Sequence, residues 1–317
     1  MDLLYISIFV AGMWFLIKGA DIIVNHATKV ARQLGISKFM IGLTLVAFST
    51  TLPELSVSLL SAFSGVAAIA TGTVVGSIIV NTGLILGVAA IIRPMITNEE
   101  TLKLSYFMIL FVLMLSLVLF DGIVWYEGVI LLTAFLVYMY SYFLDVRKQR
   151  RLRAIVGPTR KKLIPEKSDR KETAKHVMYC IAGGMIVVMG AQMLIDSTIK
   201  LAEWLGVSEL VISLLLISVG TSLPEFAVAI TGAVKRVSGI SIGDIIGANI
   251  YNIFVISLSS LVATVPVTQN LVLFNIPLMI ILSFALMLSI KSGWRIKRNE
   301  GVLLLGLYVV FVLLQLM

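Results

Sequence analysis

Segments of about 18 to 25 mostly apolar residues recur along the whole chain, and they constrain its fold more than any other feature. A segment of that length crosses roughly 30 Å of hydrocarbon as a helix. Ten such segments have centres near residues 13, 50, 80, 112, 134, 188, 220, 251, 280 and 308. With 59% hydrophobic residues and a mean hydropathy of +1.04, the chain is too apolar for a soluble protein of 317 residues. We therefore predict an all-α integral membrane protein with ten transmembrane helices.

The positive charge of the chain is concentrated in one connection between these segments. Residues 145–175 hold twelve Lys or Arg and four Asp or Glu, which accounts for the whole net charge of +8. Because cytoplasmic loops are enriched in Lys and Arg, we expect this loop in the cytoplasm, without nucleic acid as a partner. Alternation of ten helices then places 23 of the 25 basic residues inside and both termini outside. We expect the chain in the cell (plasma) membrane, with His26 and His176 solvated at cytoplasmic loops.

The chain contains an internal repeat. A shift of 171 positions aligns residues 19–81 with residues 190–252 without a gap, and about a third of the positions are identical. The identical positions include the pairs Gly35 and Gly206, Pro53 and Pro224, Glu54 and Glu225, Gly72 and Gly243, and Asn81 and Asn252. Chance similarity between apolar helices would not preserve this set of pairs.

The repeat predicts an inverted architecture. Each copy holds five helices, and an odd number forces the second copy to enter the membrane from the opposite face. We therefore predict a first five-helix repeat at residues 1–145, a basic cytoplasmic loop at 146–175 and a second, inverted repeat at 176–317. This arrangement is typical of secondary transporters, in which symmetric parts alternate access around a central site.

A Pro-Glu pair interrupts the second and the seventh helix. Proline removes a backbone donor and clashes with the carbonyl four residues earlier, so Pro53 frees the carbonyl of Ser49 and Pro224 that of Gly220. Irregular backbone at membrane depth is tolerated where it is buried in protein or lines a watery cavity. We expect the two broken helices to meet at the midplane.

The two breaks are rich in hard oxygen ligands, which suit Ca²⁺ and also Na⁺. Their side chains are Glu54, Glu225, Thr50, Thr51, Thr221 and Ser222. Two nearby carboxylates in hydrocarbon repel each other, so they need a divalent cation, several monovalent cations or protons. The other interpretation is that they are protonated or paired with a base, for which Lys18 is the only intramembrane candidate.

The helix after each break carries a second row of small or polar residues on one face. The two rows, at i, i+4 and i+8, are Thr73, Ser77 and Asn81, and Asp244, Ala248 and Asn252. Ser77, Asn81 and Asn252 are candidate ligands. Close packing of small residues between helices is the other interpretation of these rows.

These motifs resemble those of a known family. The stretches FSTTLPELSVS with GTVVGSIIVN, and VGTSLPEFAVA with GDIIGANIYN, are similar to the two alpha repeats of the calcium/cation antiporter superfamily, closest to the prokaryotic sodium/calcium exchangers. The resemblance covers nearly all of the membrane part. It implies a ten-helix antiporter that expels Ca²⁺ in exchange for Na⁺, with no cofactor and no enzymatic activity.

The resemblance also implies the ligands and the moving part. The implied ligands are Glu54, Glu225, Thr50 and Thr221 for both ions, the carbonyls of Ala47 and Ser218 with the hydroxyl of Ser77 for Na⁺, and Asn81 and Asn252 at the centre. Helices one and six would slide over a more static core.

The chain departs from the family pattern near these ligands. Ala248 stands where the family often has a sodium-binding serine, and Asn252 stands where some members carry Asp. Thr73 and Asp244 replace the usual Asn after Gly, and Asp244 is an extra acid in or beside the cytoplasmic path. These changes leave the divalent site intact, but they leave the driving ion and the coupling ratio open.

Three alternatives follow from the same residues. Glu54, Glu225 and Asp244 could carry protons, which would make the chain an exchanger of H⁺ for Ca²⁺ or another divalent cation. The stretch SIGD at 241–244 approaches the GxGD motif of intramembrane aspartyl proteases, although Ser241 breaks that motif. A passive channel is disfavoured by inverted repeats with broken helices, and the sequence has no GxxxxGK[ST] motif for ATP. The oligomeric state is left open.

Overall fold

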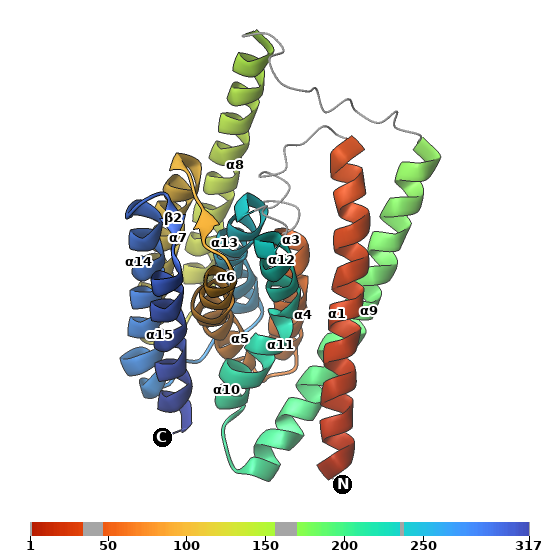
Figure 1. Ribbon diagram of the computed structural model, residues 1–317. Coiled ribbons are helices and arrows are strands. Elements are labelled where there is room, and N and C mark those ends of the chain that lie inside the picture. The colour runs from red at the N-terminus through yellow and green to blue at the C-terminus, as the bar shows by residue number, and fades with distance from the viewer. Residues whose placement is uncertain (1, 34–46, 156–169, 235–237, 317) are drawn as a thin grey trace.

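The computed structural model describes residues 2–33, 47–155, 170–234 and 238–316, which are almost entirely helical (Figure 1). The elements before residue 156 are α1 (Asp2–Gln33), α3 (Ala47–Thr50), α4 (Leu52–Phe63), α5 (Ala68–Ile79), η2 (Val80–Ile85), α6 (Leu86–Ile92), β1 (Met95–Ile96), α7 (Glu99–Val118) and α8 (Trp125–Ile155). Those after residue 169 are α9 (Arg170–Leu205), α10 (Glu209–Ile212), η3 (Ser213–Ile217), α11 (Ser218–Thr221), α12 (Leu223–Val234), α13 (Ser238–Val262), η4 (Leu271–Asn275), α14 (Ile276–Lys291), β2 (Arg295–Ile296) and α15 (Arg298–Leu316). The η elements are π-helical turns within longer helices. The all-α prediction is confirmed.

Seven helices in the described ranges are long and apolar enough to cross a membrane. They are Ala68–Ile92, Glu99–Val118, Trp125–Leu144, Ala174–Leu205, Ser241–Val262, Leu271–Lys291 and Arg298–Gln315. The broken pair Glu209–Thr221 and Leu223–Val234, bent by 43°, is an eighth candidate. Each of the ten predicted centres lies in a helix, but α1 and α4 carry shorter apolar stretches, Leu4–Phe15 and Leu52–Phe63. The count of ten spans therefore stays a prediction.

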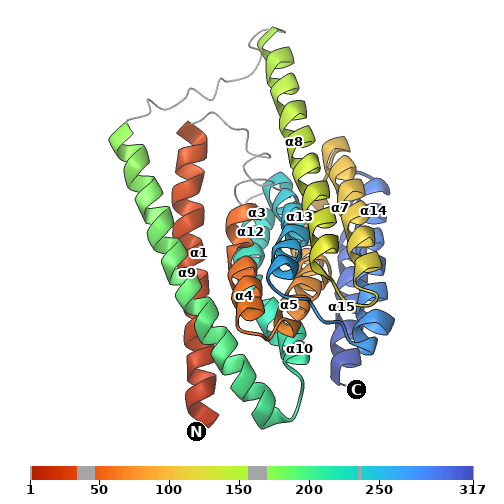
Figure 2. The ribbon, with the colours of Figure 1, turned by 180° about the vertical axis from the view of Figure 1, so that it is seen from behind.

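The helices alternate between two ends of the bundle (Figures 1 and 2). The C-terminal ends of α1, α6, α8, α12 and α14 lie on one side of the bundle, and both chain termini lie on the opposite side. Strands β1 and β2 pair antiparallel on the first side, with Met95 opposite Ile296. Residues 156–169 of the basic loop, Lys38, Lys235 and Arg236 lie outside the described residues. The alternation agrees with the predicted order of connections, and the side that faces the cytoplasm remains a prediction.

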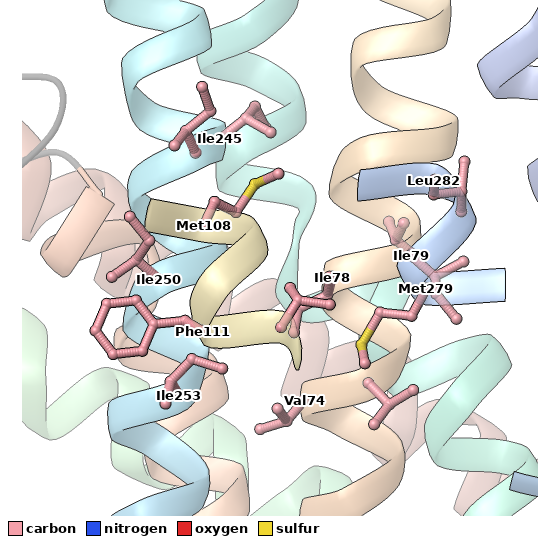
Figure 3. Close-up of a cluster of buried hydrophobic side chains, with 14 of the residues drawn as sticks. Val74, Ile78, Ile79, Met108, Phe111, Ile245, Ile250, Ile253, Met279 and Leu282 are labelled. Atoms are coloured by element: carbon pink, nitrogen blue, oxygen red, sulfur yellow. The ribbon is translucent and has the colours of Figure 1, made fainter. Parts of the chain in front are cut away.

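Helices α5 and α13 form the centre of the bundle. In the spans Ala68–Ile92, which begins with α5, and Ser241–Val262 of α13, 78% of the most apolar 18 residues are buried, compared with 17% for Arg298–Gln315 at the periphery. Figure 3 shows side chains of α5, α7, α13 and α14 gathered in one buried cluster, with the labelled members Val74, Ile78, Ile79, Met108, Phe111, Ile245, Ile250, Ile253, Met279 and Leu282. This core fixes the two helices that carry the rows of small and polar residues.

Glycines bring α5 into close contact with the second half of the chain. An added Cβ on Gly76 would lie 2.6 Å from the Cβ of Ser218 and 3.0 Å from the carbonyl oxygen of Leu214. An added Cβ on Gly72 would collide with the Cβ of Ser213. Small residues at such crossings let backbones approach closely, so both glycines serve close packing between α5 and the second half of the chain.

We expect Gly76→Ala to destabilise the protein by about 1 to 3 kcal/mol, because overpacking at a backbone contact cannot relax easily. Gly306→Ala is the matched control, since a Cβ on this α15 glycine meets nothing within 4 Å. That change should be neutral or stabilising by up to about 1 kcal/mol. Thermal unfolding of the purified variants, followed by size-exclusion chromatography, measures both effects. Equal unfolding temperatures for the two variants would contradict the close-packing account.

Helices α1 and α9, with 32 and 36 residues, are the longest in the described ranges and lie side by side on one flank of the bundle (Figures 1 and 2). They run in opposite directions. The Nδ1 atoms of His26 and His176 lie 2.8 Å apart, and Tyr179 stacks on His26. The prediction that both histidines are solvated in loops is wrong, because both helices continue past their apolar stretches and pack on each other. His176 is 7% exposed.

We expect the contact between α1 and α9 to weaken in acid. The pKa of His26 is lowered by burial, by His176, and by the charges of Lys29 and Lys175. The folded protein therefore binds fewer protons than the unfolded chain, so this contribution to stability is complete above about pH 6.5 and falls below it. The unfolding temperature should fall between about pH 7 and pH 5, and less steeply in His26→Gln. Identical pH profiles of the two proteins would contradict this expectation.

Candidate cation site

The two Pro-Glu breaks have the same local structure. Thr51 separates α3 from α4, and Ser222 separates α11 from α12. Helical hydrogen bonds continue around both breaks, from the backbone N–H groups of Thr51, Leu55, Ser222 and Phe226 to the carbonyls of Ala47, Thr51, Ser218 and Ser222 at 3.0 to 3.2 Å. Each proline interrupts the ladder between these bonds, as the sequence predicts.

The break positions one glutamate at the start of each second half-helix. Glu54 lies in the first turn of α4, and Glu225 lies in the first turn of α12. The exposed fractions of these side chains are 1% and 0%. A helix N-terminus carries a partial positive charge and therefore stabilises a carboxylate in its first turn. This partial charge is too small to neutralise two buried carboxylates.

The first cluster of oxygens lies around Glu54. Its Oε1 accepts hydrogen bonds from the hydroxyls of Ser77 and Ser222, at 3.3 and 3.2 Å. The two serine oxygens lie 3.3 Å apart. In the adjacent turn, the hydroxyl of Thr221 donates to the carbonyl of Ser218 at 3.4 Å. The cluster thus joins α4 and α5 of the first repeat to the break of the second.

The second cluster lies around Thr50. Its hydroxyl lies 3.2 Å from Oδ1 of Asp244 on α13, and also 3.2 Å from the carbonyl oxygen of Ala47. The hydroxyl of Thr51 donates to the same carbonyl at 2.5 Å. Glu225 is buried in the first turn of α12, three residues after Ser222, which itself contacts Glu54. Three buried acids therefore lie in one region of the bundle.

Amide side chains lie behind these clusters. Asn81, in the π-helical turn η2, donates to Oδ1 of Asn249 at 3.1 Å, and Asn249 donates to Thr82 at 2.9 Å. Both side-chain polar atoms of Asn252 lack a hydrogen-bond partner within the described residues. Sequence reasoning missed Asn249, because it lies outside the i, i+4, i+8 row. Its only signal is a second amide, three residues before Asn252, in the stretch GANIYN.

The site is occluded and has unused ligand capacity. None of the twelve candidate residues is more than 3% exposed. Within the described part of the chain, the oxygens without a hydrogen-bond partner include Oε2 of Glu54, both carboxylate oxygens of Glu225, Oδ2 of Asp244, and Oδ1 of Asn81 and Asn252. Leaving buried carboxylates unpaired is costly, so this donor set fits hard cations.

No basic side chain among the described residues pairs with these acids. Lys18, the one intramembrane candidate, is exposed on α1 and, among the described residues, makes no ion pair with any of them. The described part of the chain also has no group of three or more His, Cys, Asp or Glu side chains gathered to hold one metal ion. The acids are therefore spread over more than one position, and hydroxyl, carbonyl and amide oxygens must complete any cation site.

Comparisons with known proteins identify the family. The family model described as "Sodium/calcium exchanger protein" matches residues 4–144 and 175–317. The chain belongs to the sodium/calcium exchanger family. It is a multi-pass integral membrane protein and a transporter, not an enzyme, so the alternative of an intramembrane protease is discarded.

Named relatives cover almost the full length of the chain. Sodium/calcium exchanger MaX1 of Methanosarcina acetivorans is 35% identical over 96% of both chains. Inner membrane protein YrbG of Escherichia coli is 32% identical over 98% of this chain and 96% of its own. The solved structure of the sodium-calcium exchanger NCX_Mj soaked with 10 mM Na⁺ and zero Ca²⁺ matches with a TM-score of 0.71, at 29% identity and 99% coverage of both chains. A second structure of NCX_Mj, soaked with 2.5 mM Na⁺ and 10 mM Sr²⁺, matches with the same TM-score.

Proposed function

We propose that this chain is a secondary active antiporter that extrudes Ca²⁺ in exchange for Na⁺. The observation that supports it best is the burial of Glu54 and Glu225 at two facing helix breaks, where Oε2 of Glu54 and both carboxylate oxygens of Glu225 have no hydrogen-bond donor among the described residues. Two carboxylates balance one Ca²⁺, and carbonyl and hydroxyl oxygens complete its preferred set of six to eight ligands. The relatives named as sodium/calcium exchangers support the choice of ions.

The proposed architecture is ten transmembrane helices in two inverted five-helix repeats, residues 1–145 and 176–317. In Figure 1, α3 and α4 run away from the end that holds β1 and β2, whereas α10 to α12 run toward it. Opposite directions for the two broken helices support the inversion. The basic loop at 146–175 faces the cytoplasm and both termini face outward, in the cell membrane.

The proposed ligands divide between a central site and peripheral sites. Glu54 and Glu225 hold Ca²⁺ at the centre, where Asn81 and Asn252 face them. Thr50 and Thr221, like the two glutamates, contact both ions. The further ligands for Na⁺ are Thr51 and the carbonyl of Ala47 around the first break, and Ser77, Ser222 and the carbonyl of Ser218 around the second. No cofactor is needed, because the ions are substrates.

Exchange follows from occupancy of this occluded site. Na⁺ and Ca²⁺ compete for the same carboxylates, so the site opens to each side with one kind of ion bound. If three Na⁺ exchange for one Ca²⁺, one net charge crosses per cycle, which is worth about 2.3 kcal/mol at 100 mV. The long pair α1 and α9, which lies on one flank of the bundle, is the moving element.

Exchange of H⁺ for Ca²⁺ is the second candidate, and one observation favours it. Asp244 is fully buried and adds a third acid beside the two glutamates. A third carboxylate would provide a place for a proton during the cycle.

Uptake of ⁴⁵Ca²⁺ by proteoliposomes separates the two candidates. Vesicles loaded with Na⁺ are diluted into sodium-free medium, and a matched set receives only a pH gradient. We expect uptake with the Na⁺ gradient alone, and loss of this uptake in Glu54→Gln and Glu225→Gln, which keep the size of the side chain but remove its charge.

Other outcomes discriminate as clearly. Uptake driven only by protons would replace Na⁺ with H⁺ as the coupling ion. If neither gradient drives ⁴⁵Ca²⁺ uptake, in protein that still elutes as a single folded species, Ca²⁺ transport would be contradicted altogether.

We expect the loss of a charged ligand to reduce Ca²⁺ uptake more than the loss of a neutral ligand. Thr50→Ala removes a neutral hydroxyl and Glu54→Gln removes a carboxylate, and contacts with charged groups are roughly twice as strong as neutral ones. We expect Glu54→Gln to abolish uptake and Thr50→Ala to raise the half-saturating Ca²⁺ concentration by about tenfold or less. Equal loss in both variants, with folded protein, would overturn this ranking.

A further inference from the structure

The two breaks are related by the repeat, but their oxygens are not equivalent. Around the second break, Ser77 of α5 and Ser222 both donate to Glu54. The shift of 171 positions relates Ser77 to Ala248, which carries no oxygen in its side chain. The cluster around the first break therefore lacks the hydroxyl that its partner has.

A carboxylate lies beside the missing hydroxyl. Asp244 precedes Ala248 by four residues, so both lie on the same face of α13, one helical turn apart. Oδ1 of Asp244 lies 3.2 Å from the hydroxyl of Thr50, and this hydroxyl lies 3.2 Å from the Ala47 carbonyl. The counterpart of Asp244 in the first repeat is Thr73, whose hydroxyl has no hydrogen-bond partner among the described residues.

The other oxygen of Asp244 is available to a ligand. Asp244 is 0% exposed, and its Oδ2 is without a hydrogen-bond partner in the described ranges. Both oxygens of Glu225 are likewise without a partner there. Three acids do not surround one point. A cation held by Asp244 would thus lie to one side of the pair Glu54 and Glu225.

We propose that Asp244 takes the place of the missing hydroxyl and forms, with Thr50 and the carbonyl of Ala47, a peripheral Na⁺ site that carries its own negative charge. The peripheral site at Ser77 and Ser222 is neutral apart from Glu54. The two peripheral sites therefore differ in affinity, and the Asp244 site binds Na⁺ more tightly because it adds a full charge at contact distance. This inference rests on the proposed function for the identity of the ion.

Stabilisation of the purified full-length protein by cations tests this site. The unfolding temperature is measured in detergent while Na⁺ replaces choline at constant ionic strength, and in a separate Ca²⁺ titration. Asp244→Asn keeps an oxygen for Thr50 but removes the charge. We expect its half-saturating Na⁺ concentration to rise by about tenfold or more, with a change of less than about threefold for Ca²⁺.

Two further variants separate a ligand from a structural role. Ala248→Ser in the Asp244→Asn background supplies the hydroxyl found at Ser77, and it should recover part of the lost Na⁺ affinity. Thr73→Val changes the matched position of the other repeat and should leave the Na⁺ titration within about twofold of the wild type. An unchanged Na⁺ titration in Asp244→Asn would overturn the proposal. Two other results would also overturn it. One is an equal loss of Na⁺ and Ca²⁺ affinity in Asp244→Asn that Ala248→Ser does not restore. The other is a loss of Na⁺ affinity in Thr73→Val as large as that in Asp244→Asn.

The titrations also distinguish this site from the proposed function. Na⁺ binding that depends on Asp244, in protein that shows no sodium-driven ⁴⁵Ca²⁺ uptake, would leave the site standing and refute the antiport. A wild type that Na⁺ does not stabilise, but Ca²⁺ stabilises through Glu54 and Glu225, would refute the Asp244 site and keep the divalent site.

Discussion

Burial of carboxylates without basic partners is the constraint on which the rest of this structure depends. Glu54, Glu225 and Asp244 are at most 1% exposed, and no Lys or Arg in the described ranges pairs with them. An uncompensated charge in a low-dielectric interior costs several kcal/mol, so the folded protein with all three ionised requires bound cations. The same requirement couples the transport of the two ions. A site with unneutralised carboxylates cannot change its access from one side of the membrane to the other without a large cost in free energy, so it must carry ions in both directions.

The helix breaks and the glycines hold these charges in place. Proline ends one half-helix and starts another, and the first turn of the new half-helix carries the glutamate at its positive end. Gly72 and Gly76 let α5 approach η3 and α11, which brings Ser77 to the same carboxylate as Ser222. The core of α5, α7, α13 and α14 supports this arrangement, while α1 and α9 lie outside it on one flank (Figures 2 and 3).

The features that the sequence predicts best are those that depend on local chemistry or on the repeat. Helical periodicity, the two proline breaks and the positions of both glutamates follow from residue types and spacing. The contact of Thr50 with Asp244, the amide Asn249 and the pair of His26 with His176 join residues 150 to 194 positions apart. Such contacts depend on how each helix is rotated and how deeply it packs, and no local pattern encodes that. The repeat also predicts the two peripheral sites incompletely. Ala248 and Asp244 of the second repeat stand where the first repeat has Ser77 and Thr73, so the side chains around the two breaks are not equivalent.

Anomalous diffraction from crystals of this protein grown with Sr²⁺ in place of Ca²⁺ tests the central claim most directly, since it locates the divalent ion without reference to transport. The account predicts one strong peak between the two helix breaks, within about 2.6 Å of carboxylate oxygens of both Glu54 and Glu225, with no equivalent peak in Glu225→Gln. A peak that contacts neither glutamate, or no peak in crystals whose protein binds Sr²⁺ in solution, would contradict it.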